Sequence, residues 1–197
     1  MKKDNIFDSS MVLFFIGNSG SGKDTIMKEL KKKFDSLGVS TIIPKRRITR
    51  ENHESEKFVS LDENTFIQCV NEFKFILHWF IYGNYYGFLK SDVFPYLNGK
   101  HYILMNISRA IAMDALTKFP EAKLINLVVD KNIAIERVTK RKRDTEQMIN
   151  QRIIRMNNKI PLPDIFISLH NNVTSDIPIN VQKIINLLSI SQNIAEN

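Results

Sequence analysis

Apolar residues along the chain alternate between two patterns. Residues 11–16 form a short continuous apolar run, as in a strand that is buried on both faces of a parallel sheet. Residues 24–34 follow with apolar side chains at helical spacing. The same pairing recurs as 102–106 with 108–118 and as 124–129 with 132–140. This alternation predicts an α/β fold in three layers, with helices on both faces of a parallel core sheet.

The middle of the chain follows a different pattern. Short β-type runs surround a helical segment; the runs are 58–61, 75–80 and 85–88, and the helix is 62–73. We expect this region, about 46–88, to form a small mixed insertion that holds an acceptor substrate.

The chain has 197 residues, of which 43% are hydrophobic, which is enough for one sizeable core. We therefore expect residues 1–197 to form a single domain. Its core would comprise about 10–45 and 100–190, and would end in a strand at 164–169 and a closing helix at 181–188.

Charge narrows the class of partner. The formal net charge is +7 and the pI is about 9.4, which admits nucleic acid or small polyanions such as nucleotides and sugar phosphates. Basic residues gather in two clusters, at 45–50 and 137–155. Two clusters suit a site for two phosphorylated substrates, and no motif interleaves aromatic residues with the basic runs. Nucleic acid is therefore the less favoured partner.

The apolar run at 11–16 is too short to span a bilayer and leads into a glycine-rich turn, so it predicts neither a transmembrane helix nor a signal peptide. The single cysteine, Cys69, allows no intramolecular disulfide. We expect a cytoplasmic protein with no membrane partner. The oligomeric state stays open.

The clearest motif lies between the first strand and the first helix. Gly17-Asn-Ser-Gly-Ser-Gly22-Lys23 has the spacing G-x-x-x-x-G-K of a phosphate-binding loop, the P-loop. Its glycines let backbone N–H groups face phosphates, the helix N-terminus adds positive charge, and the lysine reaches the β- and γ-phosphates. The predicted ATP-binding residues are Gly17, Asn18, Ser19, Gly20, Ser21, Gly22, Lys23, Asp24 and Thr25.

The position after the P-loop lysine departs from the common pattern. Asp24 stands where a Ser or Thr hydroxyl usually contacts Mg²⁺, and Thr25 follows it. The metal ligand could be the carboxylate, Thr25 or a water held by either. Asp24 could equally be a helix-start acid that the helix dipole stabilises.

Several segments together resemble one family. They are the P-loop with Asp24, Arg46-Arg-Ile-Thr-Arg50, Ser55-Glu-Lys-Phe-Val-Ser-Leu61, His78-Trp79 with Gly83-Asn-Tyr-Tyr-Gly87, and Asn106-Ile-Ser-Arg-Ala110. Over about 11–188 the chain resembles the guanylate-kinase-like ribose 1,5-bisphosphate phosphokinases. The resemblance implies a P-loop kinase that uses ATP and Mg²⁺ to convert ribose 1,5-bisphosphate to phosphoribosyl diphosphate, often within phosphonate utilisation.

The acceptor side is expected to consist largely of arginines. Guanidinium groups can grip phosphate at two points, and Arg109 follows a core strand at the edge where α/β proteins bind ligands. The phosphate-binding tyrosine of true guanylate kinases falls at Glu56. The predicted acceptor-binding residues are Arg46, Arg47, Arg50, Glu56, Tyr86 and Arg109. Alternatives are a surface patch for the first three arginines and core packing for Tyr86.

True guanylate kinases share the scaffold but differ at the acceptor. The positions that contact guanine or GMP in those enzymes are occupied here by His53, His78, Phe88, Met105 and Ile107. Guanine would therefore find no carboxylate, and a site that leaves a ligand's polar groups unpaired discriminates against that ligand.

A short lid is expected at about 140–145. The resemblance puts the adenine- and phosphate-contacting arginines on Arg137, Arg141 and Arg152, and Lys142 on a position that is usually glycine. With Lys23 these three arginines form the predicted catalytic set, because mobile arginines can neutralise charge that develops during phosphoryl transfer. A solvated helix face is the alternative for Arg137 and Arg141.

The sequence thus predicts a kinase for ribose 1,5-bisphosphate. The acceptor nucleophile would be an ionised phosphate oxygen, so no general base is needed. One alternative is guanylate kinase or another nucleoside monophosphate kinase. A second is a non-catalytic guanylate-kinase-like binding module, which the intact Gly17, Gly22 and Lys23 oppose.

Overall fold

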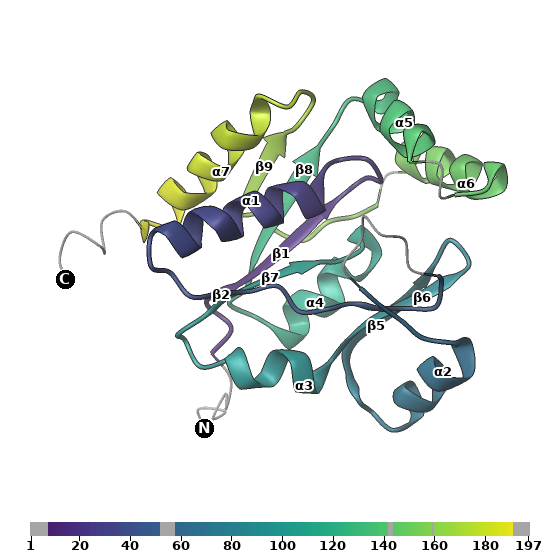
Figure 1. Ribbon diagram of the computed structural model, residues 1–197, viewed down its shortest axis with the longest axis horizontal. Coiled ribbons are helices and arrows are strands. Elements are labelled where there is room, and N and C mark those ends of the chain that lie inside the picture. Colours follow the sequence, from purple (N-terminus) through teal and green to yellow (C-terminus); the bar gives the residue numbers. More distant parts are fainter. Residues whose placement is uncertain (1–7, 52–57, 142–143, 159, 191–197) are drawn as a thin grey trace.

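The computed structural model describes residues 8–51, 58–141, 144–158 and 160–190. Its central sheet has the strand order β2-β7-β1-β8-β9, and every neighbouring pair is parallel (Figure 1). The strands are β1 (Val12–Gly17), β2 (Thr41–Ile42), β7 (Tyr102–Asn106), β8 (Lys123–Val128) and β9 (Ile167–His170).

Helices cover both faces of this sheet, which confirms the expected three-layer α/β fold (Figure 1). α1 (Lys23–Ser36) and α7 (Asp176–Leu187) pack together on one face, and α4 (Ala112–Lys118) lies on the other. Apart from α2, which accompanies the second sheet, the other helices are α3 (Lys90–Val93), α5 (Lys131–Lys140), α6 (Glu146–Asn157), η1 (Phe94–Tyr96) and η2 (Arg109–Ile111). No helix within the described ranges has the length and apolar composition needed to cross a membrane.

β1 is buried on both of its faces. Val12, Phe14 and Ile16 belong to a cluster shared with α4 and the second sheet, whereas Leu13 and Phe15 belong to a cluster shared with α1 and α7. All five side chains are fully buried. Burying one such side chain contributes about 2 kcal/mol, so this strand needs a continuous apolar run rather than an alternating one.

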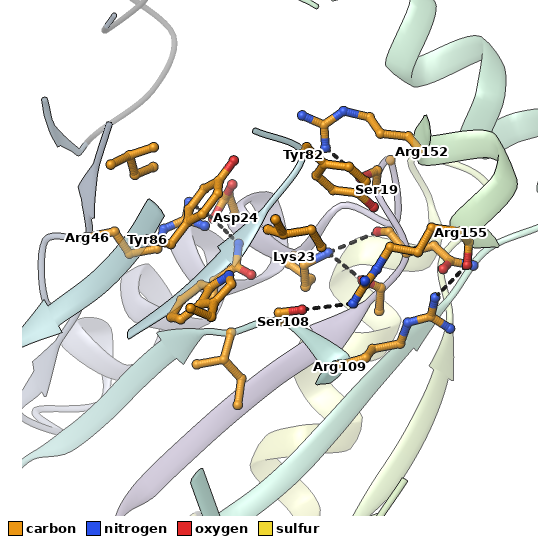
Figure 2. Close-up of a pocket in the computed structure, with 18 of the residues that line it drawn as sticks. Ser19, Lys23, Asp24, Arg46, Tyr82, Tyr86, Ser108, Arg109, Arg152 and Arg155 are labelled. Carbon is orange, nitrogen blue, oxygen red and sulfur yellow. Dashed lines mark hydrogen bonds and ion pairs between the residues drawn. The ribbon is translucent and has the colours of Figure 1, made fainter. Parts of the chain in front are cut away.

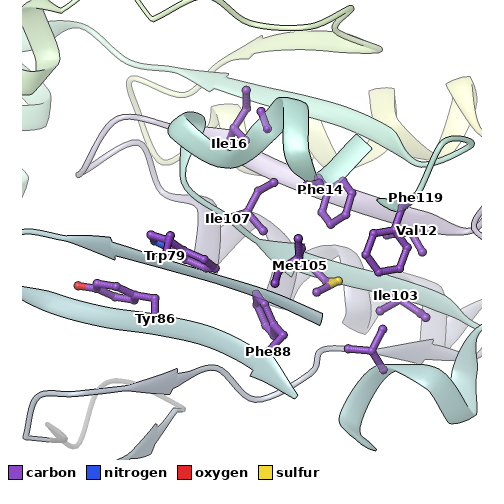
Figure 3. Close-up of a cluster of buried hydrophobic side chains, with 14 of the residues drawn as sticks. Val12, Phe14, Ile16, Trp79, Tyr86, Phe88, Ile103, Met105, Ile107 and Phe119 are labelled. Carbon is purple, nitrogen blue, oxygen red and sulfur yellow. The ribbon is translucent and has the colours of Figure 1, made fainter. Parts of the chain in front are cut away.

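A second, four-stranded sheet has the order β4-β3-β6-β5. Its strands are β3 (Arg47–Ile48), β4 (Val59–Ser60), β5 (Phe75–Ile81) and β6 (Asn84–Leu89), and α2 (Glu63–Asn71) lies between β4 and β5 in the chain. Trp79 and Phe88, from the β5–β6 hairpin, share a buried cluster with Met105 and Ile107 (Figure 3). The second sheet therefore packs against the core at the end of β7.

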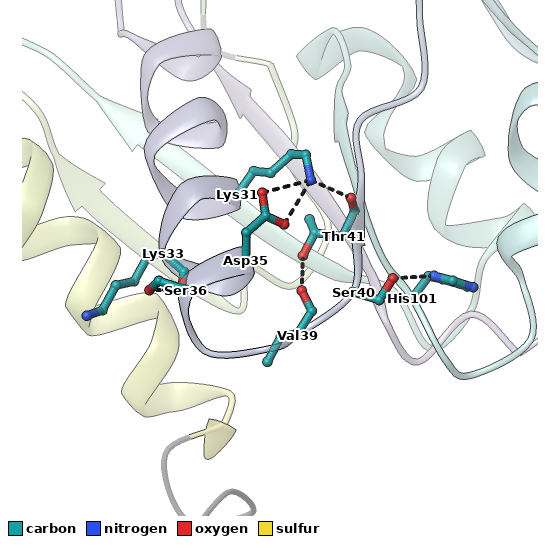
Figure 4. Close-up of polar contacts among 8 residues, drawn as sticks. All are labelled: Lys31, Lys33, Asp35, Ser36, Val39, Ser40, Thr41 and His101. Carbon is teal, nitrogen blue, oxygen red and sulfur yellow. Dashed lines mark hydrogen bonds and ion pairs between the residues drawn. The ribbon is translucent and has the colours of Figure 1, made fainter.

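Polar contacts fix the edge strand β2 against its neighbours (Figure 4). Lys31 Nζ donates to Asp35 Oδ1 at 2.9 Å and to the carbonyl oxygen of Thr41 at 2.9 Å. Ser40 Oγ lies 2.7 Å from His101 Nδ1. These contacts anchor the segment that leads to Arg46 and the second sheet.

Some boundaries differ from the expected ones. α7 begins at Asp176 rather than at 181, because the Asp176 carboxylate accepts the N–H groups of Asn172 and Val173 and because Pro178 falls in the first turn, where a missing N–H costs nothing. The strand expected at 164–169 is the shorter β9. β3 was not predicted, since two residues are too few to show a periodic pattern.

Candidate active site

The P-loop motif forms the turn between β1 and α1. Gly17, Gly20 and Gly22 have φ values of 142°, 83° and 84°, a region that favours glycine. A Cβ atom on Gly17 would lie 2.3 Å from the carbonyl oxygen of Leu127, and one on Gly22 would lie 2.3 Å from Asn171 Nδ2. Both conformation and space therefore require glycine here, and the N-terminus of α1 faces the loop.

Arg137 supports this loop from outside the cleft. Its guanidinium donates to the carbonyl oxygens of Gly20 at 3.2 Å, Asn171 at 2.8 Å and Asn172 at 2.7 Å. The Asn171 side chain in turn donates to the carbonyl oxygen of Ser21 at 2.8 Å. The sequence predicted a catalytic role for Arg137, but the structure does not bring it among the residues that line the cleft.

A strongly basic cleft lies over the loop, between the central sheet, the second sheet and α6 (Figure 2). The cationic side chains that line it are Lys23, Arg46, Arg50, Arg109, Arg141, Arg152 and Arg155. Among the described residues that line the cleft, Asp24 carries the only carboxylate. Such a field attracts polyanions.

Lys23 sits at the base of the cleft. Its ammonium donates to the carbonyl oxygens of Gly17 at 3.0 Å and Asn18 at 2.9 Å (Figure 2). Burial lowers the pKa of Lys23 to about 7; the Asp24 carboxylate opposes this change, and the surrounding arginines add to it. A bound phosphate would restore the charged form of the lysine.

Asp24 joins three segments at the mouth of the loop. Asn106 Nδ2 donates to Asp24 Oδ1 at 2.7 Å, and Arg46 forms an ion pair with the same oxygen at 3.5 Å. Desolvation raises the pKa of Asp24, but Arg46, Asn106 and Lys23 outweigh it, so the pKa falls below its usual range. Asp24 therefore stays ionised at neutral pH, and its side chain is 54% exposed to the cleft.

Asp24 and Thr25 suit a magnesium ion that is held mainly by substrate phosphates. Asp24 and Thr25 both line the cleft and offer hard oxygen ligands. No group of three or more His, Cys, Asp or Glu side chains that could hold a metal occurs in the described part of the chain. Mg²⁺ commonly keeps its waters and uses one or two protein oxygens together with substrate phosphates, so this sparse donor set is suitable.

α6 contributes two arginines to the cleft. Arg152, only 6% exposed, donates to Ser19 Oγ of the P-loop at 2.8 Å and pairs with Asp144 Oδ1 at 2.9 Å. Arg155 donates to Ser108 Oγ at 3.1 Å and accepts through its carbonyl oxygen from Arg109 at 3.1 Å. Burial and then the neighbouring Arg155 lower the pKa of Arg109.

The predicted acceptor residues divide into two groups. Arg46, Arg50, Tyr86 and Arg109 line the cleft. Arg47 does not, because it leaves β3 in another direction and pairs with Asp92 at 2.7 Å. Glu56 and His53 lie outside the described residues, as does Lys142 of the expected lid, whereas His78 is exposed and is not part of the cleft.

No role was predicted for several residues that line the cleft. Asn106 and Ser108 lie in the Asn106-Ile-Ser-Arg-Ala110 segment that contributed to the resemblance, but no role was predicted for either residue. Arg155 belongs to the basic cluster at 137–155, but no individual role was predicted for it. No sequence pattern marked Tyr82, because its contacts come from residues far away in the chain.

No protein-family model matches the chain, but individual relatives do. A ribose 1,5-bisphosphate phosphokinase of Thiobacillus denitrificans is 30% identical over 146 residues, which cover 73% of this chain and 75% of that protein. A guanylate kinase of Fusobacterium nucleatum is 30% identical over 139 residues, which cover 70% and 74%. The chain belongs to the guanylate-kinase-like family of kinases. It is therefore a phosphotransferase, and the family implies ATP, a divalent metal and a phosphorylated substrate.

The fold of this kinase agrees with that assignment. A crystal structure of guanylate kinase from Anaplasma phagocytophilum matches it with a TM-score of 0.65 over 92% of this chain and 85% of that chain, at 16% identity. The ribose 1,5-bisphosphate phosphokinase and the guanylate kinase named above have the same percentage identity to this chain. Sequence identity therefore does not show which acceptor this kinase uses. The acceptor has to be argued from the cleft.

Proposed function

We propose that this kinase transfers the γ-phosphoryl group of ATP to ribose 1,5-bisphosphate, giving ADP and phosphoribosyl diphosphate. One observation carries the proposal: seven cationic side chains and one carboxylate line the described cleft. ATP and a sugar bisphosphate together bring many negative charges to one site, and a cleft of this composition offsets their repulsion. Since ATP and sugar phosphates are metabolites of the cytoplasm, we propose that the reaction takes place there.

The acceptor wall favours a sugar bisphosphate over a purine nucleotide. Ile48, Trp79, Ile81 and Ile107 give this wall an apolar surface, and Tyr86 stacks on Trp79 with ring centroids 5.5 Å apart. Recognition of guanine requires acceptors for its N–H groups, and unpaired polar groups of a ligand weaken binding strongly. The one carboxylate of the described cleft, Asp24, already pairs with Arg46 and Asn106 beside the P-loop.

Two sources of positive charge suit the two phosphates of the acceptor. Arg46 and Arg50 flank β3, whereas Arg109 begins η2 after β7. Cations on separate elements can grip two phosphates at opposite ends of a small sugar, with no need for a base pocket.

The proposed transfer needs alignment and charge neutralisation rather than a base. An ionised oxygen of the phosphate at C1 attacks the γ-phosphorus of ATP and forms a new P–O bond. The bond to the β,γ-bridging oxygen breaks, and its electron pair leaves with ADP. Lys23, Arg141 and Arg152 would neutralise the charge that develops on the phosphoryl oxygens. Asp24 and Thr25 would hold Mg²⁺, which when bound draws charge from the phosphate oxygens.

An acceptor screen tests the proposal. ADP release would be measured with ATP and Mg²⁺ in the presence of ribose 1,5-bisphosphate, GMP, dGMP or AMP. We expect kcat/KM for the sugar bisphosphate to exceed that for GMP by at least about 100-fold, because guanine lacks a partner. Arg50→Ala should lower kcat/KM for the acceptor, whereas Lys45→Ala, which removes the same charge from an exposed neighbour outside the cleft, should not.

A preference for GMP would overturn the acceptor assignment and leave a guanylate kinase. Activity with none of the four acceptors would also overturn it and would point to a different phosphorylated acceptor.

A further inference from the structure

Tyr82 occupies a backbone position that its residue type does not favour. Ile81 pairs with Asn84, so Tyr82 and Gly83 alone form the turn of the β5–β6 hairpin. Their φ values are 53° and 72°, and a two-residue turn with positive φ at both positions usually carries Asn-Gly or Asp-Gly. A bulky residue in this conformation is strained, so the turn itself does not account for a tyrosine.

The contacts of the Tyr82 ring supply a reason. The guanidinium carbon of Arg152 lies 4.3 Å from the ring centroid, and that of Arg155 lies 5.9 Å from it (Figure 2). Both arginines come from α6, which follows the second sheet by more than fifty residues in the chain. The hairpin tip thus meets α6 through one aromatic face and two cations.

Arg152 is held from three directions at this point. Its guanidinium carbon lies over the Tyr82 ring, Asp144 accepts from one terminal nitrogen, and Ser19 of the P-loop accepts from the other. The hydroxyl and the carboxylate hold the two terminal nitrogens, and the Tyr82 ring limits movement of the guanidinium toward the hairpin. The ring therefore helps to keep the Arg152 guanidinium beside the P-loop, where the γ-phosphoryl group of ATP would lie.

We propose that Tyr82 is a positioning residue that links the acceptor-side hairpin to the phosphoryl-transfer arginine Arg152. The hairpin carries Trp79 and Tyr86 of the acceptor wall, so its tip can align Arg152 only when this wall is in place. The ring acts through its aromatic face, and its hydroxyl is not required. The proposal rests on phosphoryl transfer by this kinase and not on the identity of the acceptor.

Three variants separate positioning from a structural role. Tyr82→Asn removes the ring but places at this position a residue that tolerates positive φ, so the thermal midpoint should stay equal or rise. Its kcat should nevertheless fall about ten-fold, with the KM for ATP changed less than about two-fold, since the P-loop is intact. Tyr82→Phe keeps the ring and should keep kcat within about two-fold of the wild type. Phe80→Leu, on the same hairpin but 61% exposed and outside the cleft, is the matched control.

These rates would be measured with ribose 1,5-bisphosphate, or with GMP if the screen selects it, so a wrong acceptor assignment would not affect this test. Wild-type kcat in a folded Tyr82→Asn variant would overturn the proposal. So would a Tyr82→Phe variant as slow as Tyr82→Asn, because the hydroxyl would then carry the effect. A lowered midpoint in Tyr82→Asn with kcat lost in proportion would make the residue merely structural.

Discussion

Replacing Lys23 by methionine should abolish phosphoryl transfer while leaving the unliganded protein at least as stable as the wild type. The ammonium is a ligand-facing charge that burial disfavours, as its pKa of about 7 indicates. Methionine keeps most of the apolar stem and removes the charge. The variant should therefore lose kcat by a factor of about 1,000 or more without unfolding.

The expected gain in stability of the Lys23→Met variant can be worked out from the pKa of Lys23. The difference between 10.5 and about 7 is worth about 5 kcal/mol against the folded state. The unfolded chain holds this proton more tightly, so the penalty is complete below about pH 7 and disappears as the pH rises toward 10.5. The side chain is partly exposed and also donates to Gly17 and Asn18, which reduces the expected net gain to about 1–2 kcal/mol.

Thermal unfolding without nucleotide measures this effect. For a chain of this size the gain corresponds to a midpoint about 3–6 °C higher at pH 6.5, and it should shrink by roughly half at pH 9. Lys28→Met is the matched control, because Lys28 is exposed on the same helix outside the cleft. A midpoint several degrees lower for Lys23→Met at pH 6.5, with Lys28→Met unchanged, would refute the reasoning and make Lys23 a packing residue.

Three further predictions concern neighbouring residues. Asp24→Ala should raise the magnesium concentration needed for half-maximal rate more than Thr25→Ala does; a shift in Thr25→Ala alone would leave Asp24 as a helix-start acid and a partner of Arg46. Arg109→Ala should raise the acceptor KM by about ten-fold with little change in the KM for ATP, and an equal change in both would argue against an acceptor role. Arg137→Ala should lower the free energy of unfolding in urea by about 2 kcal/mol, because it leaves carbonyl groups of the P-loop surroundings without donors; unchanged stability would contradict the supporting role.

Much of the fold could be predicted because it depends on local pattern. The run at 11–16 is apolar at every position because β1 is covered on both faces, and the helical spacing at 24–34 matches the buried stripe of α1. The two-residue strand β3 left no such trace, since one of its pairing partners, β6, lies far away in the chain.

The P-loop motif could be recognised in the sequence because its residues are contiguous. Backbone N–H groups, glycine conformations and the lysine all fall within seven neighbouring positions, so a spacing rule captures them. Asp24 was recognised as unusual, but its partners Arg46 and Asn106 were not, because the second of these lies 82 positions away.

The sequence by itself determined that this chain has a P-loop motif, a basic character and an α/β core, because each of these is a property of composition or of short-range spacing. Tertiary structure alone decided which arginines reach the cleft. Arg46 and Arg47 are adjacent, yet one faces Asp24 and the other pairs with Asp92. Arg137 and Arg152 were both predicted as catalytic arginines, yet Arg137 supports the loop and Arg152 lines the cleft. The direction of a side chain depends on strand register and on packing partners that are distant in sequence, and a linear pattern does not contain that information.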